Sequence, residues 1–334
     1  MKIQSLTATR AIAAIMVVIH HYGSDLYPFS LCGNLFHSGN LAVGYFFVLS
    51  GFVLYISQKK IAYLKFIKNR LARIAPAYLI ALILMIAVLI CFYPPPDTNI
   101  FQQIICSALF IQSFFPAYVL ELNSPAWSVS VEMFFYLLFP LLLYIKDTKK
   151  IIYLTIVAYL ASQIVHIYYA PKIWDLTGSG IYFNPLIHLN QFLIGISGAI
   201  IFEKRPSVFK QKYLSLFFVA FLVVLILVRP LQISYGAGLM APIYLMIILC
   251  IASSDICWLN NKILVYLGEV SFGIYIYQMP VYKMLQRLNI VYWHQPKYVS
   301  FYCSFAILVI IAILSYHLVE QPIIRMIRKR DATQ

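Results

Sequence analysis

Apolar residues along this chain gather into runs close to twenty residues long, and polar residues gather between the runs. A helix of about 20 apolar residues is long enough to cross the roughly 30 Å hydrocarbon core of a bilayer. The pattern therefore predicts an all-α polytopic membrane protein, and we treat residues 1–334 as a single integral membrane domain. Eleven apolar segments are present, near residues 3–22, 41–57, 74–93, 100–116, 128–145, 150–169, 184–202, 211–228, 235–252, 264–284 and 298–319.

One of these segments differs from the others in its surroundings. Segment 100–116 is among the shortest, lies between the run Pro94-Pro95-Pro96 and Pro116, and has no basic residue on either side. Irregular backbone is tolerated at membrane depth where it lines a cavity of the protein. We expect this segment to be re-entrant or interfacial on the outer side. About ten transmembrane helices then remain, and both termini are expected in the cytoplasm.

Composition and charge agree with this interpretation. Hydrophobic residues make up 62% of the chain and charged residues only 11%, while the formal net charge is +14. Such an excess can indicate nucleic-acid binding, but the basic residues form no single patch. Instead, 19 of the 25 lysines and arginines lie in alternate loops and near the termini, as the positive-inside rule requires of cytoplasmic segments. The charge thus reflects topology, and we expect membrane lipid and no nucleic acid as a partner.

Sequence motifs for metals and nucleotides are absent. The six cysteines are scattered without a CxxC pair, and the sequence has no HExxH motif, no Walker loop and no glycine-rich dinucleotide pattern. We therefore predict no metal site and no permanently bound cofactor. Any chemistry must be performed by side chains inside the helical bundle.

The most informative polar residues lie in the first apolar segment. Arg10 and His21 are eleven residues apart, so on a helix they point within about 20° of one another and are separated by a rise of roughly 16 Å. His20 points about 80° away from the Arg10 line, and we expect it to be a wall or interface residue. An ionisable side chain at membrane depth costs about 2.5 to 3.5 kcal/mol and usually faces a cavity, a partner or a substrate. Arg10 and His21 are thus candidate functional residues.

A second basic pair lies at the start of the third apolar segment. Arg70 and Arg73 are three residues apart and share one face at the cytoplasmic end of a helix. Two guanidinium groups so placed form a fork that suits phosphate groups. The alternative is topological, because basic residues are expected at cytoplasmic helix ends for any function.

One carboxylate, Glu132, lies near the expected outer end of the fifth apolar segment. Glu132 follows Trp127 by five residues, about one turn below the expected outer surface and at the level expected for His21. A carboxylate at that depth would orient the imidazole and stabilise its protonated form, as a general base requires. The alternative is a structural ion pair or hydrogen bond, and both interpretations stay open.

Taken together, these motifs resemble one family. The stretches concerned are LTATRAIAAIMVVIH and the histidine after it (6–21), FFVLSGFVL (46–54), NRLARIAPAY (69–78), WSVSVEMFFY (127–136), LGEVSFGIYIYQMPV (267–281) and SYHLVEQP (315–322). They are similar to the acyltransferase-3 family of integral membrane acyltransferases, and the similarity runs from the first helix to the last.

The resemblance implies an activity. The family transfers acetyl or another short acyl group from acyl-CoA, with acetyl-CoA the expected donor, to a hydroxyl of an extracytoplasmic or lipid-linked glycan. Such proteins are multi-pass proteins of the bacterial cytoplasmic (inner) membrane. By resemblance we expect His21 and Glu132 to be catalytic, Arg10, Arg70 and Arg73 to bind the donor, and Trp127, Ser130 and Gln278 to bind the acceptor.

One position departs from the family pattern. Many members have His before the proline of the tenth-helix motif, where this chain has Gln278-Met279-Pro280. Glutamine keeps the capacity to form hydrogen bonds but cannot shuttle a proton near neutral pH. If this position contacts the acceptor, the acceptor is expected to be unusual.

A different class of protein also fits the intramembrane His and Arg. A proton-coupled transporter, or a flippase for a lipid-linked sugar, would use the same residue types. Against this alternative, the hydrophobic segments show no internal repeat, and the Arg70 and Arg73 fork has no obvious role in proton coupling.

Overall fold

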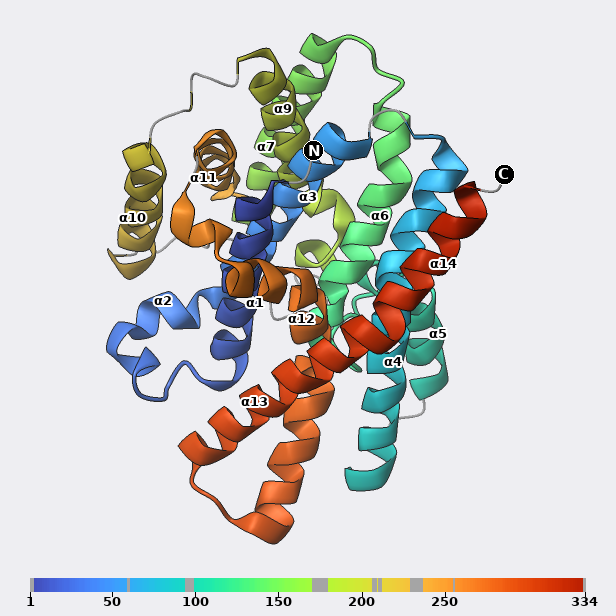
Figure 1. The fold of residues 1–334 in the computed structure, drawn as a ribbon, viewed down its shortest axis with the longest axis vertical. Coiled ribbons are helices and arrows are strands. Elements are labelled where there is room, and N and C mark those ends of the chain that lie inside the picture. The colour runs from blue at the N-terminus through green and yellow to red at the C-terminus, as the bar shows by residue number, and fades with distance from the viewer. Residues whose placement is uncertain are drawn as a thin grey trace.

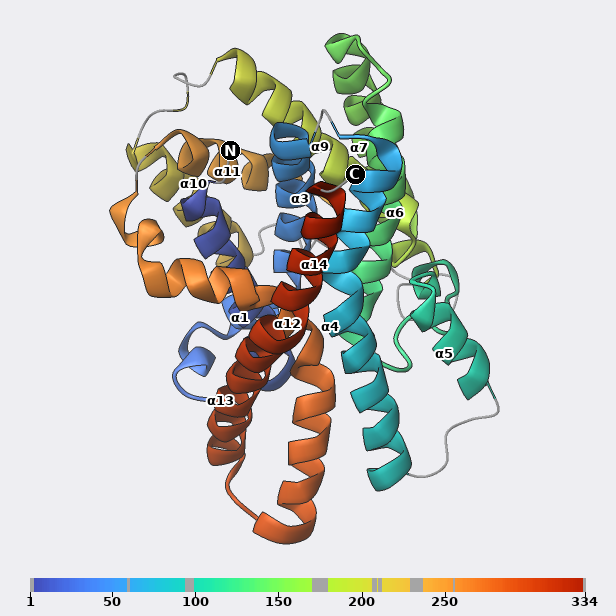
Figure 2. The same cartoon turned by 45° about the vertical axis from the view of Figure 1, so that its right-hand side comes forward.

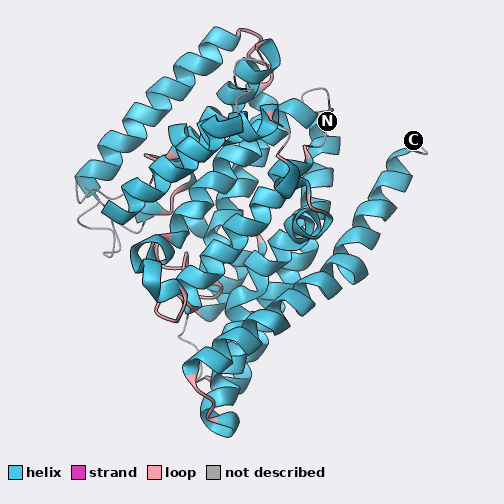
Figure 3. Cartoon of the chain, turned by 60° about the vertical axis from the view of Figure 1, so that its left-hand side comes forward, coloured by secondary structure: helices cyan, strands magenta, loops and turns pink. Residues whose placement is uncertain are grey.

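The chain folds into a bundle of helices joined by short irregular segments (Figure 1). The computed structural model describes residues 3–58, 61–93, 99–169, 180–205, 209, 212–228, 237–254 and 256–332, and the run Pro94 to Pro96 lies outside these ranges. Figure 3 shows helices and loops, and no strand, throughout this described part. The α-helices are α1 (Gln4–Tyr22), α2 (Gly33–His37), α3 (Ala42–Gln58), α4 (Tyr63–Phe92), α5 (Ile100–Ala108), α6 (Trp127–Leu142), α7 (Thr148–Tyr169), α9 (Pro185–Lys204), α10 (Lys212–Val228), α11 (Ala241–Ser253), α12 (Lys262–Leu288), α13 (Lys297–Ser315) and α14 (Gln321–Ala332).

Six helical stretches of the described chain are long and apolar enough to cross a membrane. They are Gly39–Gln58, Tyr63–Phe92, Ser124–Leu142, Thr148–Tyr169, Gly180–Lys204 and Lys297–Lys329. The fold class is therefore confirmed as all-helical with several membrane-spanning helices. The expected cytoplasmic location of both termini stays a prediction. The expected count of about ten spans stays a prediction.

Segment 100–116 is too short in its helical part to span a bilayer. Helix α5 has nine residues, which correspond to a rise of about 14 Å. The chain then leaves the helix with Phe110 at a positive φ of 59° and forms two 3₁₀ turns, Gln112–Phe114 and Ser124–Ala126, before α6 begins. The re-entrant or interfacial location of this segment stays a prediction.

Glycines allow two pairs of helices to approach closely. A methyl group added to Gly51 of α3 would lie 2.1 Å from the carbonyl oxygen of Phe192, and one added to Gly195 of α9 would lie 2.0 Å from that of Val48. A methyl group added to Gly268 of α12 would lie 1.9 Å from the backbone oxygen of Thr7 in α1. Small residues at such crossings are typical of membrane bundles, because they bring backbones into van der Waals contact.

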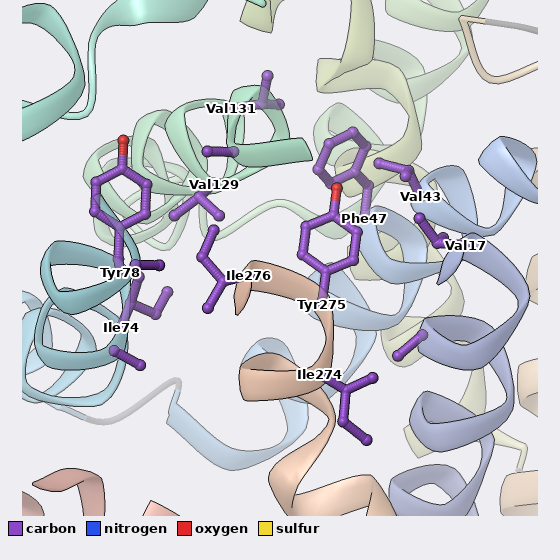
Figure 4. Packing of buried hydrophobic residues seen from close by; sticks show 14 of the residues in the cluster. Val17, Val43, Phe47, Ile74, Tyr78, Val129, Val131, Ile274, Tyr275 and Ile276 are labelled. Carbon is purple, nitrogen blue, oxygen red and sulfur yellow. The ribbon is translucent and has the colours of Figure 1, made fainter. Parts of the chain in front are cut away.

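The main apolar core lies between α1, α3, α4, α6 and α12. Figure 4 shows part of it, with Val17, Ile74, Val129 and Ile274 among the labelled side chains. Side chains from distant parts of the sequence interlock there, and α1 packs against α12 (Figure 2). Helix α13 continues through a π-helical turn, Tyr316–Glu320, into α14, which packs beside α4.

The α1–α12 crossing generates a prediction about stability. Gly268→Ala is expected to destabilise the protein by about 1 to 3 kcal/mol, the usual cost of overpacking, because the new methyl group meets rigid backbone. Thermal unfolding in detergent measures the effect. Gly33→Ala is the control, since a methyl group there would lie 3.6 Å from its nearest neighbour, the His37 ring. Equal melting temperatures for both variants would contradict the proposed close crossing.

Candidate active site

Helix α1 places Arg10 and His21 on opposite ends of one helical face. His21 lies in the last turn of α1 and its side chain is exposed. The neighbouring His20 lies in a different direction, against the short 3₁₀ helix before α3, where a methyl group added to Gly39 would lie 2.8 Å from the His20 Cβ atom. This position agrees with the expected wall role of His20.

The partner of His21 comes from α12. The Nδ1 atom of His21 lies 3.0 Å from Oε1 of Gln278, while Nε2 of Gln278 donates to the backbone oxygen of Tyr275 at 2.7 Å. Gln278 has an exposed fraction of 0%, and its amide packs between α12 and α1 against the candidate catalytic residue. Its expected role in acceptor binding stays a prediction.

The three arginines expected to bind the donor are brought together. Arg10 of α1 interacts electrostatically with Arg70 and Arg73 of α4 and with Glu132 of α6. The Nε atoms of Arg10 and Arg70 are buried and have no hydrogen-bond partner among the residues that the structure describes. Within the described chain, no carboxylate lies within 4 Å of any of these guanidinium groups. The arrangement is a cationic cluster without direct counter-ions.

Glu132 belongs to this arginine cluster and not to the surroundings of His21. Its Oε1 atom accepts hydrogen bonds from Ser50 Oγ at 3.2 Å and from the Tyr136 hydroxyl. Neither a hydrogen bond nor an ion pair joins it to His21. The expected placement is thus corrected. It assumed that α6 begins at the outer surface, whereas Asn123, just before α6, is already buried.

Apolar side chains separate the arginine cluster from His21. Ala14 and Val17 lie between Arg10 and His21 on the same face of α1, with exposed fractions of 0% and 1%. Both belong to the main core cluster. The arginine cluster and His21 are therefore separated along α1 by buried apolar side chains.

Ser130 has a structural contact in this structure. Its exposed fraction is 1%, and its hydroxyl donates to the backbone oxygen of Phe110 at 2.7 Å and accepts from the backbone nitrogen of Ser113 at 3.3 Å. These contacts connect the irregular chain after α5 to α6. A role of Ser130 in acceptor binding stays a prediction.

Trp127 is half-buried in a group of rings at the start of α6. Its ring centroid lies 6.0 Å from that of Phe47, 5.0 Å from Phe183 and 5.1 Å from His188. This packing accounts for one part of the indole, while the remainder stays accessible. A role in acceptor binding stays a prediction.

A set of contacts that the sequence analysis missed joins the start of α6 to α12. Pro280 has no N–H group, so the backbone oxygen of Ile276 lacks its helical partner, and Asn123 Nδ2 donates to it at 3.0 Å. The Tyr275 hydroxyl lies 2.8 Å from Ser128 Oγ. The sequence signal for this contact is Pro280 inside a helix, because a proline leaves the carbonyl group four residues before it without its helical hydrogen bond.

A small polar cavity lies in the outer irregular segment. Tyr78, Ser107, Gln112 and Asn123 are among its lining residues, and neither His21 nor the arginine cluster contributes to it. Oε1 of Gln112 and Oδ1 of Asn123 are buried there without a hydrogen-bond partner in the described part of the chain. Such groups are commonly satisfied by ordered water.

Comparisons with known proteins give a consistent result. Residues 3–317 match the family model described as "Acyltransferase domain". The chain is 26% identical over 319 residues to Acyltransferase MdmB of Streptomyces mycarofaciens, covering 86% of this chain and 81% of that protein. It is 26% identical over 355 residues to O-acetyltransferase OatA of Staphylococcus aureus, covering 95% of this chain but 56% of that protein. The chain thus spans little more than half the length of this second relative. No solved structure matches.

The contacts of Ser130 generate a prediction. Ser130→Ala is expected to lower the free energy of unfolding by about 1 to 3 kcal/mol, because a buried carbonyl and a buried amide lose their partner. Thermal unfolding in detergent is the measurement. Ser57→Ala is the control, since Ser57 is exposed and its hydroxyl donates only to Val53 of its own helix. Loss of stability that is no greater for Ser130→Ala than for Ser57→Ala would contradict the structural role.

Proposed function

The chain belongs to the acyltransferase-3 family, and from that membership we propose that it transfers an acetyl or other short acyl group from cytoplasmic acyl-CoA to a hydroxyl of an extracytoplasmic or lipid-linked glycan. Membership and the names of its relatives make it a membrane O-acyltransferase. The donor, the acceptor and the bacterial cytoplasmic membrane as its location are our proposal.

The observation that carries this proposal is the cluster of Arg10, Arg70 and Arg73. Three guanidinium groups close together repel one another, and burial of charge without a direct partner is costly. Glu132 lies near them but beyond ion-pair distance. An anion that enters the cluster would form the charge-assisted hydrogen bonds that no carboxylate of the described protein supplies. The phosphate groups of acyl-CoA are suitable anions at the cytoplasmic mouth.

The second part of the proposal is the reach from donor site to His21. The rise along α1 from Arg10 to His21 is roughly 16 Å, a distance of the same order as an extended pantetheine arm. The thioester would approach His21 while the nucleotide stays with the arginines. Because Ala14 and Val17 fill the interval in this structure, donor binding must displace packed side chains.

At His21 two routes lead to the same product. In the first, the imidazole removes the proton from an acceptor hydroxyl, which attacks the thioester directly. In the second, the imidazole accepts the acyl group and passes it to the hydroxyl. The exposed position of His21 at the outer end of α1 supports access by an acceptor from outside.

The test of the proposed function uses surface glycans from cells with and without this protein. Mass spectrometry is expected to find one added acyl group, roughly 42 Da (C₂H₂O) if the group is acetyl, only where the protein is present. His21→Ala is expected to remove the acyl mass while the protein still accumulates. His20→Ala is the matched control and should retain it. Identical glycan profiles in all cells, or equal loss in both variants, would reject the proposal.

A separate prediction concerns the donor. Arg70→Ala and Arg73→Ala are each expected to weaken acyl-CoA binding by about 1.5 to 3 kcal/mol, the range for hydrogen bonds to charged groups. Lysine at either position should restore part of the affinity, because it keeps the charge but loses the planar fork. Calorimetry in detergent measures the affinity. Arg325→Ala, an exposed position on α14, is the control, and unchanged affinity in the Arg70 and Arg73 variants would return these residues to a purely topological role.

A further inference from the structure

The orientation of the Gln278 side chain follows from its two neighbours. One end of a carboxamide donates hydrogen bonds and the other end accepts them. The backbone oxygen of Tyr275, 2.7 Å away, can only accept, so the NH₂ group of Gln278 must face it. The oxygen Oε1 must then face Nδ1 of His21, 3.0 Å away. The backbone of α12 therefore determines which end of the Gln278 amide faces His21.

This orientation determines where His21 carries its proton. Because Oε1 of Gln278 can only accept, Nδ1 of His21 must be the donor, and the neutral ring is the Nδ1–H tautomer. The lone pair is then on Nε2, and no hydrogen bond joins Nε2 to any other residue in the described ranges. We propose that Gln278 is a positioning residue that holds neutral His21 as the Nδ1–H tautomer and leaves Nε2 free to act in acyl transfer.

The turn of α12 that carries Gln278 is itself held from outside the helix. Three contacts join this turn to α6 and the chain just before it. The Ser128 hydroxyl forms a hydrogen bond with the Tyr275 hydroxyl at 2.8 Å. Asn123 Nδ2 donates to the backbone oxygen of Ile276 at 3.0 Å, and the Ser124 nitrogen lies 3.0 Å from Met279 Sδ. The Tyr275 hydroxyl also donates to the backbone oxygen of Pro125 at 2.8 Å. Gln278 is completely buried within this arrangement, so water does not compete for its amide.

The proposal deepens the proposed function and rests on it for the reacting groups. Nε2 of His21 takes the proton of the acceptor hydroxyl as its oxygen forms a bond to the thioester carbon. The carbon–sulfur bond then breaks, and the CoA thiolate leaves and takes the proton back from Nε2. The products are an O-acyl ester and free CoA, and Nδ1 keeps its proton throughout. A neutral amide orients the ring but carries no charge to stabilise the imidazolium that forms, in contrast to the carboxylate partner of a hydrolase histidine.

Nitrogen NMR tests the tautomer without any substrate. Protein labelled with ¹⁵N-histidine is measured in detergent at a pH where His21 is neutral, and the His21 signals are identified by their loss in His21→Ala. Wild-type protein is expected to show Nδ1–H and an unprotonated Nε2. In Gln278→Leu the Nε2–H form, which a free side chain prefers, is expected to increase. Predominant Nε2–H in the wild type, or an unchanged tautomer in Gln278→Leu, would overturn the proposal.

Kinetics test the consequence for acyl transfer, with the glycan that loses its acyl mass in the absence of the protein as acceptor. Gln278→Leu is expected to lower kcat by about tenfold or more, since part of general-base catalysis is lost, while donor affinity measured by calorimetry stays within about twofold. Ser271→Ala is the matched control, because Ser271 is also buried in α12 but its hydroxyl donates only to Gly268. Equal kcat losses in both variants would assign Gln278 a merely structural role. Failure of the proposed function would remove the acylation signal from every variant, whereas the NMR result stands independently of it.

Discussion

The close crossing of α1 and α12 is the contact on which the arrangement of the site depends. Gly268 lets the two backbones touch near the start of α1, and Gln278, about three turns further along α12, forms a hydrogen bond to His21 near its end. A side chain at position 268 would separate the helices, because the atom opposite is a backbone oxygen that cannot rotate away. The hydrogen bond that orients the candidate catalytic histidine thus depends on the close helix crossing that Gly268 allows.

The polar residues of the bundle divide into two kinds. Ser128 and Ser130 have hydrogen-bond partners inside the protein, as buried polar groups generally must. The guanidinium groups of Arg10 and Arg70 instead retain buried Nε atoms that have no hydrogen-bond partner within the described ranges. Since an unsatisfied buried donor destabilises the folded state, its persistence at the predicted donor site supports a functional reason for it. Ser128 and Ser130 instead connect α6 to α12 and to the irregular chain after α5.

The separation of the arginine cluster from His21 also has a physical meaning. Val17 is packed in the core between them, so the structure corresponds to a state in which no open passage joins the arginine cluster to His21 along this face of α1. A closed interior keeps water and ions from crossing a membrane through the protein. On the proposed function, the binding energy of the donor would have to supply the rearrangement that connects them, and acyl transfer would be coupled to donor binding.

The sequence by itself determined the helical membrane fold, the shared face of Arg10 and His21 and the shared face of Arg70 and Arg73. These inferences depend on helix periodicity, segment length and charge distribution, which are local properties. Only the tertiary structure decided that Glu132 joins Arg10, because its depth depends on how the irregular chain before α6 folds inward. It also decided that Gln278 pairs with His21, a contact between residues 257 positions apart. Spacing along a helix predicts which side chains share a face, but the partner opposite that face is determined by how the helices pack.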